Sequence, residues 1–176
     1  MPLTLLIGGA RSGKSDAAIA IANRWDGPVV FVATGQPRDA EMEERIARHR
    51  ASRPREWKTI ESDGLVEALT AAGDAFVIVD CLTLWISRLM ERELSDTDID
   101  LLVHEGAEIA GGRSAPTVVV TNEVGSGIVP DNPLARRFRD LLGSANRVWA
   151  SHAARTLLVV AGRALALSSL EELTDE

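Results

Sequence analysis

One eight-residue segment near the N-terminus constrains the fold more than any other part of the chain. Residues 8–15 read GGARSGKS, which fits the pattern G-x-x-x-x-G-K-[ST]. The apolar run of residues 3–7 precedes it and is typical of a buried strand, whereas residues 15–24 place alanines and isoleucines at helical spacing. A glycine-rich turn between a buried strand and a helix predicts a nucleotide phosphate-binding loop, or P-loop.

The residue types of this loop suit phosphate binding. Glycines let backbone N–H groups converge on phosphate oxygens, and the helix that follows adds the positive end of its dipole. We expect Lys14 to reach the β- and γ-phosphates and Ser15 to bind Mg²⁺. The alternative is a glycine-rich turn without a ligand. Only Lys14 and Lys58 among the 19 basic residues are lysines, so a lysine would rarely fall at this position of the motif by chance. The predicted phosphate-binding residues are Gly8, Gly9, Ala10, Arg11, Ser12, Gly13, Lys14 and Ser15.

A second part of a nucleotide site is predicted at Asp80. Residues 75–80, AFVIVD, form an apolar run that ends in an acid. This placement puts a carboxylate near the carboxyl edge of a sheet, where it can hold Mg²⁺ or its waters. Alternatively, Asp80 only caps the helix that follows, and the two roles are compatible.

The rest of the chain alternates apolar strands with helices. Continuous apolar strands separated by helices predict a parallel sheet covered on both faces, with sites at the carboxyl ends of the strands. We therefore predict an α/β fold with a mostly parallel sheet, of the P-loop NTPase (RecA-like) type, and a single domain of residues 1–176. The predicted strands are 3–7, 29–33, 57–60, 75–80, 117–121, 156–160 and 164–167, and the predicted helices are 15–24, 39–50, 65–72, 82–93, 95–110 and 134–154.

Composition narrows the classes of partner. The net charge of −7 argues against a nucleic-acid or anionic-membrane surface, which needs clustered basic residues. No apolar run approaches the roughly 20 residues that span a bilayer, and the N-terminus lacks the basic start of a signal peptide, so we expect a cytoplasmic protein. Cys81 is the only cysteine, which excludes an intramolecular disulfide and a cysteine-based zinc cluster within one chain.

A second chemistry is suggested by His49. The predicted helix 39–50 carries Glu41, Arg45 and His49 at i, i+4 and i+8, and further arginines flank the histidine. An imidazole in a cationic setting can attack an α-phosphorus to give a phosphoramidate, while neighbouring arginines neutralise charge. The residues alone also fit a solvated, charged helix with one surface histidine.

Together these features resemble one family, the bifunctional adenosylcobinamide kinase and adenosylcobinamide-phosphate guanylyltransferase of cobalamin biosynthesis. The resemblance extends to about Gly162, and it is most specific in the segment that follows the predicted strand 117–121. The matching blocks are the P-loop, residues 39–49 (DAEMEERIARH), Arg53-Pro54 with Trp57 and Glu61, residues 80–83 (DCLT), residues 121–130 (TNEVGSGIVP), Asn132, residues 134–136 (LAR) and residues 138–140 (FRD).

The resemblance implies two reactions. In the first, the γ-phosphoryl group of ATP or GTP moves to the aminopropanol hydroxyl of adenosylcobinamide, assisted by Mg²⁺, the P-loop and Asp80. Asp80 and Glu123 are the two candidates for the base that activates this hydroxyl. In the second, His49 takes GMP from GTP with loss of pyrophosphate and passes it to adenosylcobinamide phosphate, which gives adenosylcobinamide-GDP.

The resemblance also implies further nucleotide contacts and an assembly. Glu61 would accept hydrogen bonds from the guanine N–H groups; the alternative is an exposed carboxylate without a ligand. Members of the family are trimers, so a homotrimer is expected. Two local departures from the family pattern are Arg147 and residues 154–156. The implied nucleotide contacts are Ala33, Thr34, Gly35, Arg50, Ala51, Ser52, Arg53 and Glu61.

Two other functions fit the P-loop. One is a monofunctional P-loop kinase of another small metabolite, in which His49 is a surface residue and GTP leaves no covalent mark. The other is a non-catalytic nucleotide-sensing module whose loop after Asn122 changes conformation with the bound nucleotide. Covalent retention of GMP separates the bifunctional enzyme from both.

Overall fold

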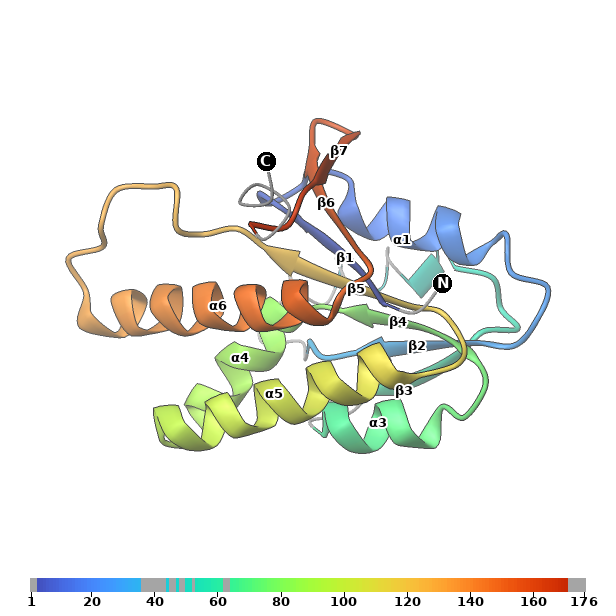
Figure 1. Ribbon diagram of the computed structural model, residues 1–176, viewed down its shortest axis with the longest axis horizontal. Coiled ribbons are helices and arrows are strands. Elements are labelled where there is room, and N and C mark those ends of the chain that lie inside the picture. The colour runs from blue at the N-terminus through green and yellow to red at the C-terminus, as the bar shows by residue number, and fades with distance from the viewer. Residues whose placement is uncertain are drawn as a thin grey trace.

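The computed structural model describes residues 3–35, 44, 47, 50, 51, 53–61 and 64–170. In this part of the chain a seven-stranded sheet has the order β3-β2-β4-β5-β1-β6-β7 (Figure 1). All neighbouring strands pair in parallel except β6 and β7, which are antiparallel. The elements are β1 (Leu3–Gly8), α1 (Lys14–Ala22), β2 (Val29–Ala33), β3 (Lys58–Glu61), α3 (Leu65–Ala71), β4 (Phe76–Asp80), α4 (Leu82–Glu91), α5 (Asp96–Gly112), β5 (Thr117–Asn122), α6 (Pro133–His152), β6 (Arg155–Val160) and β7 (Arg163–Leu167).

Helices cover both faces of the sheet, because the inner strands are apolar on both sides. Helix α1 packs on one face, and α3, α4, α5 and α6 pack on the other (Figure 1). Successive residues of one strand alternate between the two cores: Leu5 of β1 belongs to the core beneath α3–α6, and Leu6 belongs to the core beneath α1. The predicted covering of a mostly parallel sheet on both faces is confirmed.

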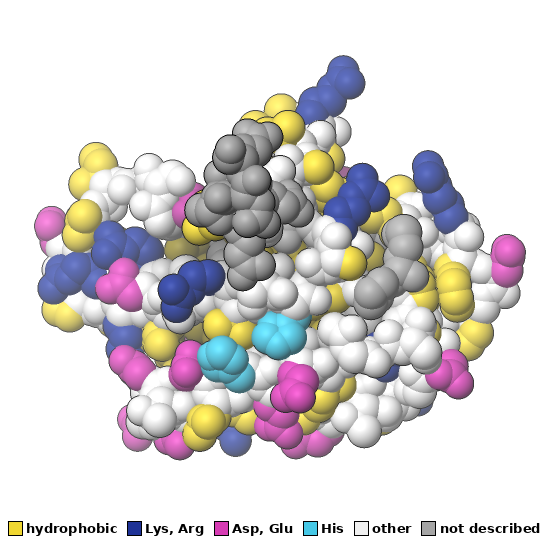
Figure 2. Space-filling view, in the orientation of Figure 1, with side chains coloured by type: hydrophobic (Ala, Val, Ile, Leu, Met, Phe, Trp, Pro, Cys, Tyr) yellow, Lys and Arg dark blue, Asp and Glu magenta, His cyan; other side chains and the backbone are white. Residues whose placement is uncertain are grey.

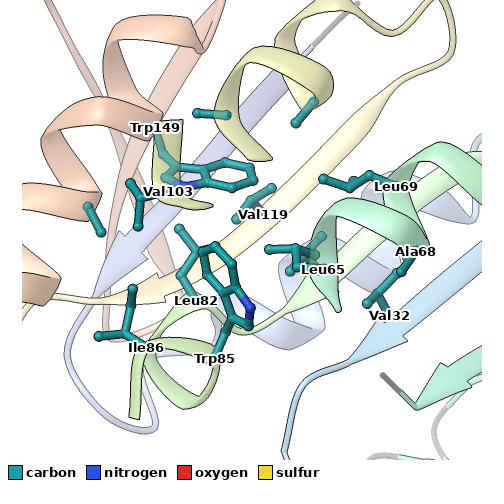
Figure 3. Packing of buried hydrophobic residues seen from close by; sticks show 14 of the residues in the cluster. Val32, Leu65, Ala68, Leu69, Leu82, Trp85, Ile86, Val103, Val119 and Trp149 are labelled. Atoms are coloured by element: carbon teal, nitrogen blue, oxygen red, sulfur yellow. The ribbon is translucent and has the colours of Figure 1, made fainter. Parts of the chain in front are cut away.

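Two buried tryptophans anchor the larger core. Trp85 of α4 and Trp149 of α6 are almost completely buried between the helices and the sheet (Figure 3). A Cβ atom added to Gly106 of α5 would lie 3.1 Å from Cζ2 of Trp149, so glycine at this position lets α5 approach the indole closely. Both indoles belong to the core that the helices share with strands β1, β2, β4 and β5.

Within the described residues, the predicted strands and helices agree with the structure, with differences of one to a few residues at their ends. The predicted helix 39–50 lies mostly outside the described residues; of that segment, Glu44, Ala47 and Arg50 are helical and exposed. No helix among the residues that the structure describes is long and apolar enough to cross a membrane.

Candidate active site at the carboxyl edge of the sheet

The P-loop joins the carboxyl end of β1 to the first turn of α1. Two left-handed residues shape it: Arg11 has a φ of 55° and Gly13, the N-cap of α1, has a φ of 98°. Glycine adopts such a φ without the steric cost that a Cβ brings, which explains the second glycine of the motif. The predicted order of buried strand, curled loop and helix is therefore present.

Lys14 is buried inside the curve of the loop, with 6% of its surface exposed. Its ammonium group donates hydrogen bonds to Gly8 O at 2.9 Å, to Gly9 O at 2.6 Å and to Ser12 Oγ at 3.3 Å. A buried ammonium needs such acceptors to offset its desolvation. The charge that would meet a triphosphate is thus held in place by the loop's own oxygens.

The first two glycines of the motif have different surroundings. A Cβ atom on Gly8 would lie 2.1 Å from the carbonyl oxygen of Val159 in β6, so the sheet itself requires glycine there. A Cβ atom on Gly9 would meet no atom within 4 Å. Packing within the protein therefore does not explain Gly9, whereas close approach of a phosphate to the backbone would.

The turn between β6 and β7 supports the loop from outside. The Gly162 N–H donates to Ser12 O at 2.9 Å, and a Cβ atom on Gly13 would lie 3.4 Å from the Cα of Gly162. Ala161 and Gly162 both have a positive φ, as a tight turn between antiparallel strands requires. The sequence predicts only that Gly162 lies between the strands 156–160 and 164–167, because nothing local indicates that this turn contacts the P-loop.

Strand register brings three predicted residues into one row. Ala33 at the end of β2 pairs with Glu61 of β3 on one side and with Asp80 of β4 on the other. In the same sheet, Gly8 of β1 pairs with Asn122 of β5. Since these strands are parallel, all five positions lie at the same carboxyl edge, where α/β sheets carry their ligand sites.

The end of β4 is tied to the segment that follows β2. The Thr34 N–H donates to Asp80 O at 3.3 Å, and the Thr34 hydroxyl bonds to both the N–H and the C=O of Cys81. Thr34 is fully buried, and its carbonyl accepts a 3.0 Å hydrogen bond from Nη1 of the buried Arg88. The peptide bond between Asp80 and Cys81 is cis. The Thr34 side chain therefore makes its hydrogen bonds within the protein, where it ties the end of β2 to the end of β4.

Arg53 lies among the charges at this edge. Its guanidinium stacks over the ring of Phe31, with 3.7 Å between Cζ and the ring centroid. Burial lowers the pKa of Arg53, the carboxylate of Asp80 raises it, and the charges of Arg50 and Glu61 have smaller effects of opposite sign. Arg50 and Glu61 form an exposed ion pair at 4.0 Å. Four of the predicted site residues, Arg50, Arg53, Glu61 and Asp80, are thus brought together from three segments of the chain.

Glu123 begins the loop that follows β5. Its N–H donates to Gly8 O at 3.2 Å, and its carboxylate accepts from the N–H groups of Gly125 at 2.5 Å and Ser126 at 3.2 Å. Hydrogen bonding from the Ser126 side chain lowers the pKa of Glu123, burial opposes this effect, and the two N–H groups lower the pKa further. These hydrogen bonds indicate that Glu123 stabilises the loop. They make Asp80, rather than Glu123, the better candidate for the base that activates the substrate hydroxyl.

The remaining predicted residues divide into two groups. Ser15 lies in the first turn of α1, directly after Lys14, and Ala51 is exposed and helical. His49 and Ser52 lie outside the described residues. The hydroxyl of Ser15 and the carboxylate of Asp80 are hard oxygen ligands of the kind that Mg²⁺ takes together with phosphate oxygens and water, so the residues fit this ion.

Comparison with solved structures agrees with the fold. The chain is similar to the RadB recombinase, with a TM-score of 0.51, 17% identity, and coverage of 89% of this chain and 73% of that one. It is also similar to an ATPase from the type III secretion system of pathogenic bacteria, with a TM-score of 0.53, 15% identity, and coverage of 98% of this chain and 60% of that one. The predicted P-loop NTPase, RecA-like fold is confirmed.

Comparison of sequences identifies the family. Residues 4–167 match the family model CobU, described as cobinamide kinase / cobinamide phosphate guanyltransferase. The bifunctional adenosylcobalamin biosynthesis protein CobU of Salmonella typhimurium is 39% identical over 91% of this chain and 96% of its own length. The protein CobP of Pseudomonas aeruginosa, which carries the same description, is 37% identical over 90% of this chain and 92% of its own length. The chain therefore belongs to the cobinamide kinase / cobinamide phosphate guanyltransferase family.

Proposed function

We propose that this chain, as a single domain, phosphorylates adenosylcobinamide with ATP or GTP and then guanylylates the product through His49. The observation that carries the proposal is the placement of two sets of residues along one carboxyl edge. The P-loop, with Lys14, follows the end of β1. Glu61, Ala33 and Asp80 lie in one row at the ends of β3, β2 and β4, respectively. The same edge of the sheet therefore carries a phosphate-binding loop and, beside it, a second set of residues that could contact a nucleotide.

For the kinase step, the P-loop would bind the triphosphate. Backbone N–H groups and the Lys14 ammonium would stabilise the charge that spreads over the γ-phosphoryl oxygens in the transition state. Mg²⁺, held by the Ser15 hydroxyl and, through its bound waters, by Asp80, would neutralise charge on the phosphates. The substrate hydroxyl forms a bond to the γ-phosphorus as the bond to the β-phosphate oxygen breaks, and its proton passes to a base, for which we propose Asp80.

For the guanylyl step, His49 would act as nucleophile. Its imidazole nitrogen bonds to the α-phosphorus of GTP, the α–β phosphoanhydride bond breaks, and pyrophosphate leaves. An oxygen of adenosylcobinamide phosphate then displaces the imidazole, which forms the new phosphoanhydride and frees His49. Arg50 and Arg53 would neutralise charge at the α-phosphate, and the pairing of Arg53 with the Phe31 ring supports a fixed position for that guanidinium.

Recognition of guanine would fall to Glu61. A carboxylate can accept hydrogen bonds from both N–H groups on one edge of guanine, which adenine does not present. Glu61 is exposed at the end of β3, in register with Ala33 of the neighbouring strand. We propose Gly35, Ala51 and Ser52 as further contacts of the same guanine nucleotide site, with the buried Thr34 contributing indirectly by positioning the ends of β2 and β4.

A homotrimer is part of the proposal. Support comes from β7, the edge strand of the described sheet, whose five residues are all exposed. Leu165 and Leu167 project from it, and an exposed apolar edge strand is a surface that proteins usually cover. Sedimentation equilibrium of the purified protein measures the assembly directly, and a monomer at micromolar concentration would exclude the trimer.

The central experiment is covalent labelling. Purified protein is incubated with Mg²⁺ and GTP labelled at the α-phosphate, denatured, and assayed for bound label that is acid-labile and alkali-stable, as a phosphoramidate is. We expect label on the wild type and on His104→Ala, a change of an exposed histidine on α5, and none on His49→Ala. The His49→Ala variant should keep kinase activity, whereas Lys14→Ala should lose both activities.

Two outcomes would contradict the proposal. If the wild type retains no label while it still phosphorylates a small metabolite, the monofunctional kinase is the better description. If His49→Ala loses kinase activity as well, the two reactions do not separate as proposed.

A further inference from the structure

The loop between β5 and α6 exposes an unusual amount of apolar surface. Ile128 is 97% exposed and Val129 is 59% exposed, and Leu134, in the first turn of α6, is 62% exposed. In Figure 1 this loop runs out beyond the carboxyl edge of the sheet before α6 returns. Hydrophobic side chains lie at its tip in the space-filling view (Figure 2). Exposed apolar side chains that gather on one loop and the adjoining helix start favour a binding surface.

The loop is fastened at both ends. At its start, Glu123 bonds to Gly8 O of the P-loop and holds the N–H groups of Gly125 and Ser126. At its end, Nη1 of Arg136 donates to Pro130 O at 2.8 Å and to Asp131 O at 2.7 Å. A loop with anchored ends presents its apolar side chains at a lower conformational cost than a loose one.

A groove continues this surface along the helices. It has a volume of about 340 Å³ and lies between the end of α4 and the start of α6. Its wall is mainly apolar, and Leu134 belongs to both the groove and the exposed surface. The lining residues are Ser87, Met90, Glu91, Asn132, Leu134, Ala135 and Phe138.

The position of the loop in the sheet indicates what it binds. Strand β5 lies between β1, which carries the P-loop, and β4, which carries Asp80. The loop therefore leaves the sheet between the group that would cradle the γ-phosphate and the proposed base. A molecule lying on this loop can bring a hydroxyl to the γ-phosphate. The nucleotide itself would bind to the P-loop and the β3-β2-β4 edge.

We propose that Ile128, Val129 and Leu134, with the adjoining groove, form the surface that binds the corrinoid acceptor. A corrin macrocycle carries methyl groups and neutral amide side chains, so it suits an apolar surface with a few polar groups such as Asn132. The inference rests on the proposed function, because it takes adenosylcobinamide as the acceptor. It goes further by assigning the acceptor to residues outside the P-loop and outside the β3-β2-β4 edge.

The test compares a double variant with a matched control. Ile128→Ser/Leu134→Ser removes two exposed apolar side chains, and Leu101→Ser removes one that is 64% exposed on α5. Two quantities are measured for each protein: the KM for adenosylcobinamide in the kinase reaction, and the extent of GMP labelling of His49. We expect the double variant to raise the KM about tenfold or more, through the loss of apolar contacts. Its GMP labelling, its thermal midpoint and the KM of the control should stay at wild-type values.

The outcomes are distinguishable. A double variant with a wild-type KM overturns the corrinoid surface and leaves the proposed function intact. A double variant with altered GMP labelling, or with altered mass in sedimentation, overturns it in favour of a nucleotide or subunit contact. A wild type that neither phosphorylates adenosylcobinamide nor takes up GMP refutes the proposed function, and the inference with it.

Discussion

Thr34 and Cys81 exchange two hydrogen bonds where β2 and β4 end. Oγ1 of Thr34 donates to Cys81 O at 2.7 Å and accepts from Cys81 N at 2.8 Å, although the two residues are 47 positions apart in the chain. Because Cys81 directly follows Asp80, this pair fixes the direction in which β4 leaves the sheet. The position of the Asp80 carboxylate relative to the nucleotide segment thus depends on one buried hydroxyl group.

Removal of that hydroxyl should be costly. In Thr34→Val the buried Cys81 N–H loses its acceptor, while Cys81 O keeps the N–H of Trp85 as a donor. We expect a loss of roughly 1–3 kcal/mol in the free energy of unfolding, measured by urea titration. Thr34→Ser should lose less, because the hydroxyl stays. Thr70→Val is the matched control, since the Thr70 hydroxyl bonds to Val66 O on an exposed helix face; an equal loss in the control would contradict the argument.

The first two glycines of the P-loop should respond in opposite ways. Gly8→Ala places a methyl group 2.1 Å from a backbone oxygen of β6, so the strands must separate, at a cost of roughly 1–3 kcal/mol or more. Gly9→Ala meets no protein atom, so its free energy of unfolding should stay within about 0.5 kcal/mol of the wild type. If a phosphate approaches this backbone, Gly9→Ala should nevertheless weaken nucleotide affinity by about tenfold or more.

Urea unfolding and nucleotide titration, carried out on both variants, check the two statements separately. A stable Gly9→Ala protein that binds GTP and ATP normally would show that phosphate does not approach the loop at this glycine.

Glu61 should determine whether the protein binds guanine or adenine nucleotides, while contributing little to the free energy of unfolding. Its ion pair with Arg50 is exposed and 4.0 Å long, and such pairs contribute about 0–1 kcal/mol. Glu61→Gln replaces one acceptor oxygen with a donor, so GMP labelling of His49 should fall roughly tenfold to a hundredfold at limiting GTP. Kinase turnover with ATP and the thermal midpoint should not change. Glu56→Gln, a nearby exposed glutamate, is the control; equal losses in both variants would indicate a general effect of charge.

Cys81 should make the protein less stable in alkali. Burial, followed by the charge of Asp80, raises the pKa of this thiol from 9.0 to about 11. The folded state therefore holds the proton more tightly than the unfolded state does. The stabilisation is complete below pH 9 and is lost as the pH rises towards 11, by roughly 2–3 kcal/mol in total. Urea titrations at pH 8 and pH 10.5 should show a smaller alkaline loss for Cys81→Ala than for the wild type, and equal losses would refute this cause.

Local pattern in the sequence determined the P-loop, the strands and the fold class. The run of apolar residues before Gly8 predicts a buried strand, and the motif that ends at Ser15 predicts a curled loop before a helix. Both are statements about neighbours along the chain, because burial of a strand and termination by glycine depend on a few adjacent residues. Asp80 was found in the same way, as the acid that ends an apolar run.

Tertiary structure alone decided which of these segments meet. The row of Glu61, Ala33 and Asp80 depends on the order and register of three strands. The hydrogen bond from Gly162 to Ser12 links two residues that are 150 positions apart in the chain. Periodicity shows which face of a strand is buried but not which strand lies beside it, since any apolar strand can pair with any other. The lateral order is settled only when all helices and strands pack into one sheet with two covered faces. That packing places the loop after β5 between the P-loop and Asp80.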